Sequence, residues 1–360
     1  MKAETRRITE MTTPKSVLIT GGCGFIGHHL ALALNRMRWK VIVYDSMNYA
    51  YKMPAYQTFI EMRLKKLAAA HIPVIQGDTR DVKALGELLS LHQPEKVVHL
   101  AAIASAEICN DDPKFGFEVN LQATQIFLEL LRRQPGIEQV VFSSSSMVYG
   151  HFHGKPMTED SPTQPIGLYG ALKLSSEYII KAYHNVFGLP YTIIRPSALY
   201  GPTCINRRVS QVFIENAILN RKLYLEGGGI NILDFTYIND LIQGLVLVLT
   251  RQEALNETFN LTYGSAHKIM DLVDLIRERY PDVEFEKRPR KKTIPRRGTL
   301  SIEKARTLLG YTPVYPLERG YPLYMDWYDV IGFKESAVEE TVLRPKALYV
   351  NLNNGGRNFS

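Results

Sequence analysis

The chain has 360 residues, of which 45% are hydrophobic and 22% charged, and its formal net charge is +7. This composition is ordinary for a globular protein and excludes a largely disordered chain. No apolar run approaches the roughly 20 residues that a membrane-spanning helix needs, and the segment from Met1 to Lys15 lacks the apolar stretch of a signal peptide. We therefore expect a cytoplasmic protein with no membrane partner, built as one large core with a smaller appended lobe.

The first predicted strand, Val17 to Thr20, leads directly into the run Gly21-Gly22-Cys23-Gly24-Phe25-Ile26-Gly27 and then into an apolar helix. Gly21 lets the chain turn sharply, and Gly24 removes a side chain where a pyrophosphate must approach backbone N–H groups. Gly27 lets the helix pack closely on the strand. The helix N-terminus then faces the anion with unpaired donors. The run predicts a dinucleotide-binding turn.

A second predicted strand, Val41 to Tyr44, ends in Asp45. An acidic residue about 20 residues after the glycines is where a ribose 2′-hydroxyl is held, and its charge would repel a 2′-phosphate. The predicted cofactor is therefore NAD rather than NADP.

After a loop and a helix between Ser46 and Ala70, strands and helices continue to alternate. The predicted strands are Pro73–Gln76, Lys96–Ala102, Gln139–Phe142 and Tyr191–Arg195, and the predicted helices are Val82–Leu91 and Asn120–Arg132. Near-continuous apolar strands that alternate with helices are typical of a parallel sheet covered on both faces. Because ligands bind at the carboxyl ends of such strands, we expect the polar or small segments at those ends to converge on one crevice.

From Gly201 the pattern loosens into shorter helices, Val209–Leu219 and Met270–Glu278, with a triple-glycine turn between them. The predicted fold is α/β, a Rossmann-type doubly wound parallel sheet with a smaller C-terminal substrate-binding lobe. We expect a flexible N-terminal segment (1–15), a mainly NAD-binding domain (16–200), a mainly substrate-binding lobe that partly returns to the core sheet (201–335), and a C-terminal arm or tail (336–360).

Two features of composition concern other kinds of site. Cys23, Cys109 and Cys204 are widely spaced, so we expect reduced structural thiols and no metal site. The basic stretch from Lys287 to Arg297 lacks a recognition module and interleaved aromatics. We interpret it as a solvated loop that can also contact a phosphorylated small molecule, with nucleic-acid binding as a distant alternative.

Tyr169 and Lys173 are four residues apart and so lie on one face of a predicted helix that follows the turn Pro165-Ile166-Gly167. A tyrosine with an ordinary pKa near 10 is a poor base, but an ammonium one turn away favours its phenolate. The same lysine can hydrogen-bond a nicotinamide ribose. Alone, this spacing favours an exposed helical pair without a catalytic role. Here it follows a serine-rich strand end in a sheet that already carries a dinucleotide turn.

Taken together, the motifs resemble the extended short-chain dehydrogenase/reductase family, especially its NAD-dependent nucleotide-sugar epimerases and dehydratases. The resemblance runs from about Val17 to Trp327. It rests on Gly21-x-x-Gly24-Phe25-Ile26-Gly27, Gly77-Asp78, His99-Leu100-Ala101-Ala102, Ser143-Ser144-Ser145-Ser146-Met147-Val148-Tyr149-Gly150, Tyr169-x-x-x-Lys173, Arg195-Pro196, Tyr200-Gly201-Pro202 and Asp234-Phe235-x-Tyr237-Ile238-x-Asp240.

The resemblance implies that Tyr169 is the general base, Lys173 its electrostatic partner, and Ser145 the hydroxyl that steers the substrate oxygen. Asn120 is equally plausible as a helix cap or as a fold-stabilising hydrogen-bonder. We expect His99 to be a strand-end histidine whose hydrogen bonds are satisfied. The expected cofactor-binding residues are Gly21, Gly24, Phe25, Ile26, Gly27, Asp45, Asp78, Thr79, Leu100, Ala101, Ala102 and Lys173.

Departures from the family pattern narrow the chemistry. Family 4,6-dehydratases place Asp-Glu after the catalytic hydroxyl and decarboxylases also keep a Glu there, whereas this chain has Ser146 and Met147. Dehydration and decarboxylation by those routes are therefore disfavoured. Glucuronate epimerases tend to carry Arg where this chain has Glu107, which would repel a substrate carboxylate. A neutral or amino-bearing sugar is expected.

Usual contacts to the substrate nucleotide are also missing. The family often has Arg immediately before the Asp-Phe pair, where this chain has Leu233, and Asn or Thr where it has Ala198. We expect replacement contacts from the arginines Arg207, Arg208, Arg296 and Arg297, with Arg207, Arg208 and Arg297 as the leading substrate-binding candidates.

The leading functional prediction is an NAD-dependent epimerase of a nucleotide-activated sugar, acting at C4 as a homodimer joined through helices of the core. Tyr169 would take the hydroxyl proton while hydride passes to NAD, and hydride would return to the other face of the keto sugar. One alternative is a reductase or dehydrogenase of a keto-sugar or other alcohol, with net redox. Another is a non-catalytic NAD-binding regulatory protein.

Overall fold

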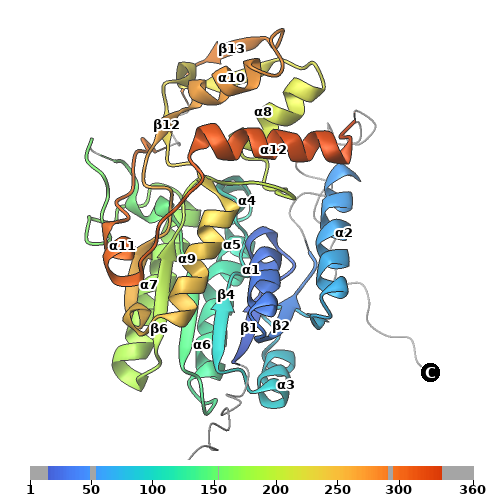
Figure 1. Ribbon diagram of the computed structural model, residues 1–360. Coiled ribbons are helices and arrows are strands. Elements are labelled where there is room, and N and C mark those ends of the chain that lie inside the picture. Colours follow the sequence, from blue (N-terminus) through green and yellow to red (C-terminus); the bar gives the residue numbers. More distant parts are fainter. Residues whose placement is uncertain (1–14, 49–53, 153, 291–294, 335–360) are drawn as a thin grey trace, which may run out of the picture.

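Seven parallel strands form the central sheet of the computed structural model, which describes residues 15–48, 54–152, 154–290 and 295–334 (Figure 1). The strand order is β11-β6-β5-β4-β1-β2-β3. These strands are β1 (Ser16–Thr20), β2 (Lys40–Asp45), β3 (Val74–Gln76), β4 (Lys96–His99), β5 (Gln139–Ser143), β6 (Tyr191–Arg195) and β11 (Glu257–Asn260). This is the doubly wound order extended by one strand, with its switch point between β1 and β4. The predicted fold class is confirmed.

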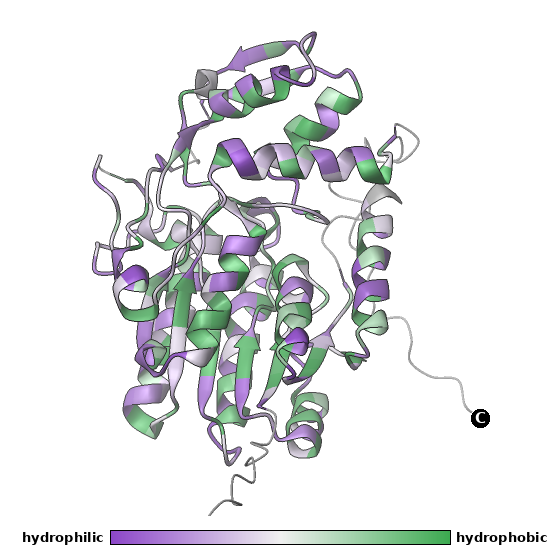
Figure 2. Ribbon diagram, in the orientation of Figure 1, coloured by the Kyte–Doolittle hydropathy of each residue, from purple (hydrophilic) through white to green (hydrophobic). Residues whose placement is uncertain are grey.

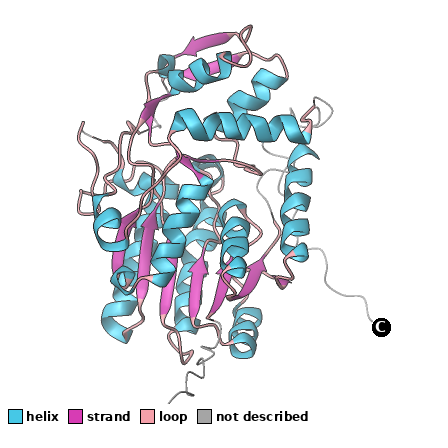
Figure 3. Ribbon diagram, in the orientation of Figure 1, coloured by secondary structure: helices cyan, strands magenta, loops and turns pink. Residues whose placement is uncertain are grey.

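Helices cover both faces of the sheet (Figure 3). One face packs against α1 (Phe25–Arg36), α2 (Pro54–Ala69) and α9 (Ile238–Thr250), and the other against α3 (Val82–His92), α6 (Ala123–Leu131) and α7 (Leu168–Phe187). Along β1 the side chains alternate between the two cores, because Val17 and Ile19 join the first cluster and Leu18 the second. Figure 2 accordingly shows strongly hydrophobic strands between helices with hydrophilic outer faces.

The chain beyond residue 200 divides between a smaller lobe and the core. The lobe lies past the carboxyl ends of the central strands (Figure 1) and contains α8 (Val209–Ile218), β8 (Leu223–Glu226), α10 (Ile269–Arg277) and β13 (Phe285–Arg288). β8 and β13 pair in parallel, whereas β11 returns to the central sheet beside β6. The predicted segments 1–15 and 336–360 lie outside the described residues, apart from Lys15.

Short elements complete the chain. They are α4 (Ala106–Asp111), α5 (Pro113–Phe117), a π-helical segment (Glu118–Gln122), β7 (Leu199–Tyr200), β9 (Ile232–Leu233), β10 (Thr236–Tyr237), β12 (His267–Lys268), α11 (Glu303–Leu309) and α12 (Leu317–Ile331), with 3₁₀ turns at Ser146–Tyr149, Gly227–Gly229 and Gln252–Ala254. Within the described ranges, no helix is both long enough and apolar enough to cross a membrane.

The helix predicted to open at Asn120 begins earlier. α5, the π-helical segment and α6 follow one another, and Asn120 lies inside the π-helical part. Its Oδ1 accepts from the Ile103 main-chain N–H at 2.7 Å and its Nδ2 donates to the Ile103 carbonyl at 3.2 Å. Asn120 is therefore a fold-stabilising hydrogen-bonder and not a cap, because its side chain reaches a distant loop.

The strand predicted to run to Ala102 ends at His99. The next residues leave the sheet because they lie against the glycine turn after β1. A Cβ atom on Gly21 would lie only 2.7 Å from the Ala101 nitrogen. The three cysteines are free and buried in the structure, as predicted.

His99 is a buried histidine whose two ring nitrogens both have partners. Nδ1 lies 2.7 Å from the Thr20 hydroxyl and Nε2 lies 3.1 Å from the Thr124 hydroxyl. Burial, aided by the charge of Lys173, lowers the pKa of His99 to about 3. The ring is therefore neutral in the folded protein at any pH above that value, in agreement with a structural role.

This pKa makes the contribution of His99 to stability depend on pH. As pH falls below about 6.5, the unfolded chain takes up a proton that the folded protein does not, so the wild type loses stability relative to His99→Gln. We expect the difference in unfolding free energy to narrow between pH 7 and 4.5, with a slope approaching about 1.4 kcal/mol per pH unit. Urea titrations measure it. His71→Asn is the exposed control over the same pH range. A difference in unfolding free energy for His99→Gln that does not change with pH would contradict the assignment.

Candidate functional site

Two adjoining cavities lie at the carboxyl ends of the central strands. The first, termed the dinucleotide cavity, is lined by Gly21, Gly24, Phe25, Ile26, Gly27, Tyr44, Asp45, Ser46, Asn48, Arg63, Gly77, Asp78, Thr79, Arg80, Leu100, Ala101, Ala102, Ile103, Ala104, Ser105, Phe115, Val119, Ile205 and Asn206. Every predicted cofactor residue except Lys173 is among them. The structure thus brings together predicted residues from four separate parts of the chain, each at or just after the end of a parallel strand.

The second, termed the reaction cavity, holds the predicted catalytic residues Ser145, Tyr169 and Lys173. Its wall also includes Ser143, Ser144, Ser146, Met147, Pro196, Ser197, Ala198, Arg208, Leu233, Phe235 and Arg297. Six residues line both cavities: Phe25, Ile26, Leu100, Ala102, Ala104 and Asn206. One elongated ligand can therefore extend from the first cavity into the second.

The glycine turn is shaped for an anion. Gly21 has φ +69°, a conformation that L side chains rarely adopt. A Cβ on Gly27 would lie 2.4 Å from the Gly21 carbonyl oxygen. The helix α1 that follows has Gly24 as its N-cap, with no side-chain cap and no acidic residue in the first turn. Its N-terminal N–H groups are thus left for a pyrophosphate, so the turn fits a dinucleotide.

Asp45 closes the ribose end of the dinucleotide cavity. Its Oδ2 accepts from the Cys23 N–H at 2.9 Å and its Oδ1 accepts from the Met47 N–H at 2.8 Å. Burial raises the pKa of this carboxyl, while the N–H donors and the charge of Arg63 lower it. Since each carboxylate oxygen has two acceptor positions, capacity remains for ribose hydroxyls. This geometry fits NAD.

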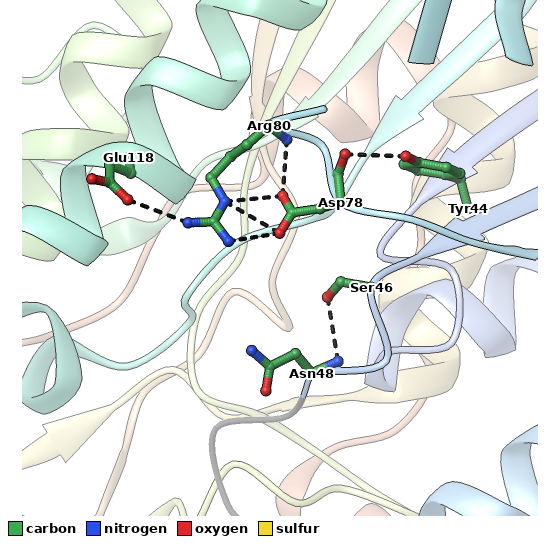
Figure 4. Close-up of polar contacts among 6 residues, drawn as sticks. All are labelled: Tyr44, Ser46, Asn48, Asp78, Arg80 and Glu118. Carbon is green, nitrogen blue, oxygen red and sulfur yellow. Dashed lines mark hydrogen bonds and ion pairs between the residues drawn. The ribbon is translucent and has the colours of Figure 1, made fainter. Parts of the chain in front are cut away.

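A charged cluster lies at the end of the dinucleotide cavity where the sequence predicts the adenine (Figure 4). Arg80 Nη2 lies 2.7 Å from Asp78 Oδ2, and Arg80 Nη1 lies 3.2 Å from Glu118. Tyr44 donates its hydroxyl hydrogen to the Asp78 carbonyl at 3.0 Å. Burial would raise the pKa of Asp78, but the hydrogen bonds from Arg80 bring it below its ordinary value. Asp78 is therefore an oriented, ionised acceptor at this end.

The predicted catalytic trio comes from two elements. Tyr169 and Lys173 lie on the first turns of α7, and Ser145 is the N-cap of the 3₁₀ turn after β5. Tyr169 is buried and hydrogen-bonds to Ser145. Lys173 Nζ donates to the Ser143 carbonyl at 2.7 Å, and burial lowers its pKa to about 8. The trio thus faces one enclosed space.

Arg208 is a second cation that acts on the predicted base. Burial raises the pKa of Tyr169, and the two influences that lower it are the charge of Arg208 and the hydrogen bond from Ser145. Lys173 lies one helical turn from Tyr169 and donates to the Ser143 carbonyl. Its role as the electrostatic partner of Tyr169 stays a prediction.

A buried ion pair supports the serine-rich strand end from behind. Arg195 Nη2 lies 2.6 Å from Glu177 Oε2, and both side chains are almost inaccessible. Ser144 donates its hydroxyl hydrogen to the same carboxylate, while Arg195 Nη1 donates to Tyr149 at 2.9 Å. Breaking such a pair from one side would leave an uncompensated charge, so the cluster locks α7 to β5 and β6.

Two of the predicted substrate-binding arginines reach the reaction cavity. Arg297 Nη1 lies 2.8 Å from Met147 Sδ, and Nη2 contacts the hydroxyls of Ser146 and Ser197. Burial lowers the pKa of Arg297 to about 10, so it stays charged at neutral pH. The Nε atoms of Arg297 and Arg208 are both buried and have no hydrogen-bond partner among the described residues. Both guanidinium groups thus retain donor capacity for an anionic ligand.

Arg207 does not join them. It is exposed, lines neither cavity and has φ +48°. The left-handed backbone turns consecutive side chains to different sides just before α8 begins, so only Arg208 faces inward. Glu107 also lines neither cavity, because it lies exposed on the first turn of α4. The expected repulsion of a substrate carboxylate by Glu107 therefore has no support in this structure.

Sequence reasoning missed Arg63, Arg80 and Asn206. Arg63 could have been noticed, because it follows Phe59 by four residues and precedes Leu67 by four, and so occupies an apolar position of its helix. Asn206 carries no comparable signal. As for metals, no group of three or more His, Cys, Asp or Glu side chains in the described part of the chain is arranged to hold an ion.

Known proteins share both the sequence pattern and the fold. The profile of the NAD dependent epimerase/dehydratase family matches residues 17–262. UDP-glucuronate 4-epimerase 1 of Arabidopsis thaliana is 30% identical over 333 residues, which span 87% of this chain and 76% of the relative. UDP-glucose 4-epimerase of Corynebacterium glutamicum is 31% identical over 314 residues, 82% of this chain and 90% of the relative.

Solved structures agree. UDP-glucose 4-epimerase of Thermotoga maritima with UDP-glucose has a TM-score of 0.80 and 28% identity, and covers 88% of this chain and 99% of that chain. UDP-glucuronic acid 4-epimerase of Bacillus cereus, in complex with UDP-glucuronic acid and NAD, has a TM-score of 0.80 and 27% identity with the same coverage. With the glycine turn, Asp45 and the catalytic trio in place, this chain belongs to the NAD dependent epimerase/dehydratase family and uses NAD as its cofactor.

Proposed function

We propose that this enzyme is an NAD-dependent epimerase that inverts C4 of a nucleotide-activated sugar. The observation that carries the proposal is the meeting of Ser145, Tyr169 and Lys173 in a cavity that shares its wall with the dinucleotide cavity. The two curated relatives described above are 4-epimerases of UDP-sugars. The positions of the dehydratase acid pair hold Ser146 and Met147, both in contact with Arg297.

The residues divide the work as follows. Tyr169 takes the proton from the sugar hydroxyl and later returns it, and Ser145 orients the same oxygen. Arg208 favours the phenolate of Tyr169. The Ser143 carbonyl accepts a hydrogen bond from Lys173 and so holds that ammonium beside Tyr169 and Ser145. Bound NAD supplies a hydride acceptor that also gives the hydride back, so there is no net redox. Arg208 and Arg297 hold the diphosphate while the sugar ring turns.

Neutral and acidic hexoses both remain candidate substrates. The neutral-sugar expectation rested on Glu107, which lines neither cavity, and the reaction cavity contains three cationic side chains and no carboxylate among its lining residues. UDP-glucose and UDP-glucuronate are therefore the two substrates to test first. A cytoplasmic location stays a prediction from the sequence.

The rival oxidoreductase function differs in its products. A reductase or dehydrogenase would make or consume free NADH in proportion to substrate. An epimerase causes no net change in the amount of NADH. The intact trio also argues against a non-catalytic regulatory role, because a silent protein has no need of a buried tyrosine that is hydrogen-bonded to a serine.

Replacing the general base tests the reaction. Tyr169→Phe should lower kcat for interconversion at C4 by about 10²–10⁴-fold, because the proton loses its acceptor. Product formation from UDP-glucose and from UDP-glucuronate is followed by chromatography, with NADH absorbance recorded in parallel. Tyr178→Phe, on the exposed face of the same helix, is the matched control. A loss below tenfold removes Tyr169 from this role, and NADH that rises with substrate consumption indicates the dehydrogenase.

Neighbouring arginines test the substrate site. Arg297→Met should raise KM for the nucleotide sugar by roughly 10–100-fold with a smaller change in kcat, because a hydrogen bond to a charged group contributes about 1.5–3 kcal/mol. Arg296→Met is the control, since Arg296 is exposed and its main chain is hydrogen-bonded to His151 and Phe152. Equal KM values for the two variants would place the diphosphate elsewhere.

A homodimer through the core helices is the proposed assembly. α7 and the neighbouring α5 carry exposed large apolar side chains, namely Phe117, Tyr178, Val186 and Phe187. Light scattering on the purified protein should give twice the chain mass, and Tyr178→Glu should shift it toward the monomer. Val330→Glu, which changes an equally exposed apolar residue on α12, should leave the dimer intact. A monomeric wild type would refute the assembly.

A further inference from the structure

Arg63 is a fully buried arginine on the inner face of α2. The side chain is 0% exposed and lies in the same helical stripe as Phe59, Ile60 and Leu67, all of which are buried. A buried guanidinium is strongly unfavourable unless it is hydrogen-bonded and compensated. The contacts that compensate it show what it holds in place.

Those contacts join two segments that are far apart in sequence. Arg63 Nη1 donates to the Cys23 carbonyl in the glycine turn at 3.2 Å, and Nη2 donates to the Thr203 carbonyl. Arg63 also lines the dinucleotide cavity, and its charge acts on Asp45 to lower the pKa of that carboxyl. One guanidinium therefore binds the cofactor turn on one side and the loop after β7 on the other.

The loop from Pro202 to Arg208 serves both cavities. Asn206 lines the dinucleotide and the reaction cavity, and Arg208 lines the reaction cavity. Thr203, the residue bound by Arg63, has φ +67°, and this conformation is unfavourable for a residue with a branched side chain. Surrounding contacts must hold Thr203 in this conformation, and Arg63 on α2 provides one of these contacts.

We propose that Arg63 is a positioning residue that couples the two cavities, so that NAD and the nucleotide sugar each strengthen binding of the other. NAD at the glycine turn orders the Cys23 side of the clamp, and this lowers the remaining cost of ordering the Thr203 loop that carries Asn206 and Arg208. By linkage, a ligand that orders the loop strengthens NAD binding by the same factor. The inference rests on the proposed function only in taking a nucleoside diphosphate as the group that binds beside Arg208.

Calorimetry on the full-length, cofactor-free protein measures this coupling without any turnover. The Kd of NAD is determined alone and in the presence of saturating UDP, or dTDP, as the probe. In the wild type the diphosphate should lower the Kd of NAD at least fivefold, about the lower bound for allosteric coupling. In Arg63→Met the two Kd values should agree within about twofold, although both ligands still bind.

Two further variants test whether the coupling depends on the geometry of the guanidinium, on its charge alone, or on a change at the surface of α2. Arg63→Lys keeps the charge, but a single ammonium cannot span both carbonyls as a guanidinium does, so coupling should again be lost. This variant decides the question if Arg63→Met does not fold. Lys65→Met, exposed on the same helix, should retain the full wild-type coupling.

The opposite results are clear. Wild-type coupling that persists in Arg63→Lys, or a wild type in which neither diphosphate changes the affinity for NAD, overturns the inference. Coupling that is present and lost as expected, in a protein with no epimerase activity on any sugar, would leave the inference standing and refute the proposed reaction. Full epimerase activity without coupling would refute the inference and leave the proposed reaction standing.

Discussion

The close approach of two main-chain segments at the switch point of the sheet governs the rest of this structure. The turn after β1 and the segment after β4 lie so near each other that a Cβ on Gly21 would be 2.7 Å from the Ala101 nitrogen. That contact ends β4 at His99 and leaves the start of α1 open toward the dinucleotide cavity. Larger residues here would push the segments apart and fill the space that a pyrophosphate requires.

Around this contact, three buried charged side chains have backbone groups as hydrogen-bond partners. Asp45 accepts from two N–H groups, Lys173 donates to the Ser143 carbonyl, and Arg63 donates to two carbonyls. Main-chain partners cannot rotate away as side chains do, so each buried charge is held in one orientation. This fixed polar environment suits a site that must stabilise a phenolate at a constant place.

The reaction cavity is less strictly specified than the dinucleotide cavity. Two of its three cations, Arg208 and Arg297, come from a loop and from a segment after β13, neither of which belongs to the central sheet. Families on one scaffold change their substrates through such segments, because loops tolerate substitution while the sheet keeps its geometry. The same arrangement makes the link from Arg63 to the loop after β7 useful, since it ties the wall that carries Arg208 to the glycine turn.

The structure brings predicted residues together where their positions are local in the chain. The glycine run, Asp45, Asp78 and the Tyr169–Lys173 pair each follow a strand or share a helix face, so their places in the fold could be predicted from the sequence. The sequence left open whether Asn120 caps a helix or reaches a distant loop, and it gave no sign of the backbone conformation that turns Arg207 outward. Arg63 and Asn206 escaped notice because their roles depend on contacts between segments about 140 residues apart.

By itself, therefore, the sequence determined the order of strands and helices, the anion-binding turn and the preference for NAD, and its resemblance to a family implied the catalytic trio. The order of elements and the turn follow from periodicity and short-range geometry, which the covalent chain imposes directly. Tertiary structure alone decided which arginines face the reaction cavity, that Arg208 acts on Tyr169, and that Glu107 lies outside both cavities. Those properties depend on distances between segments that meet only when the sheet and the lobe have packed, and no local pattern encodes such distances.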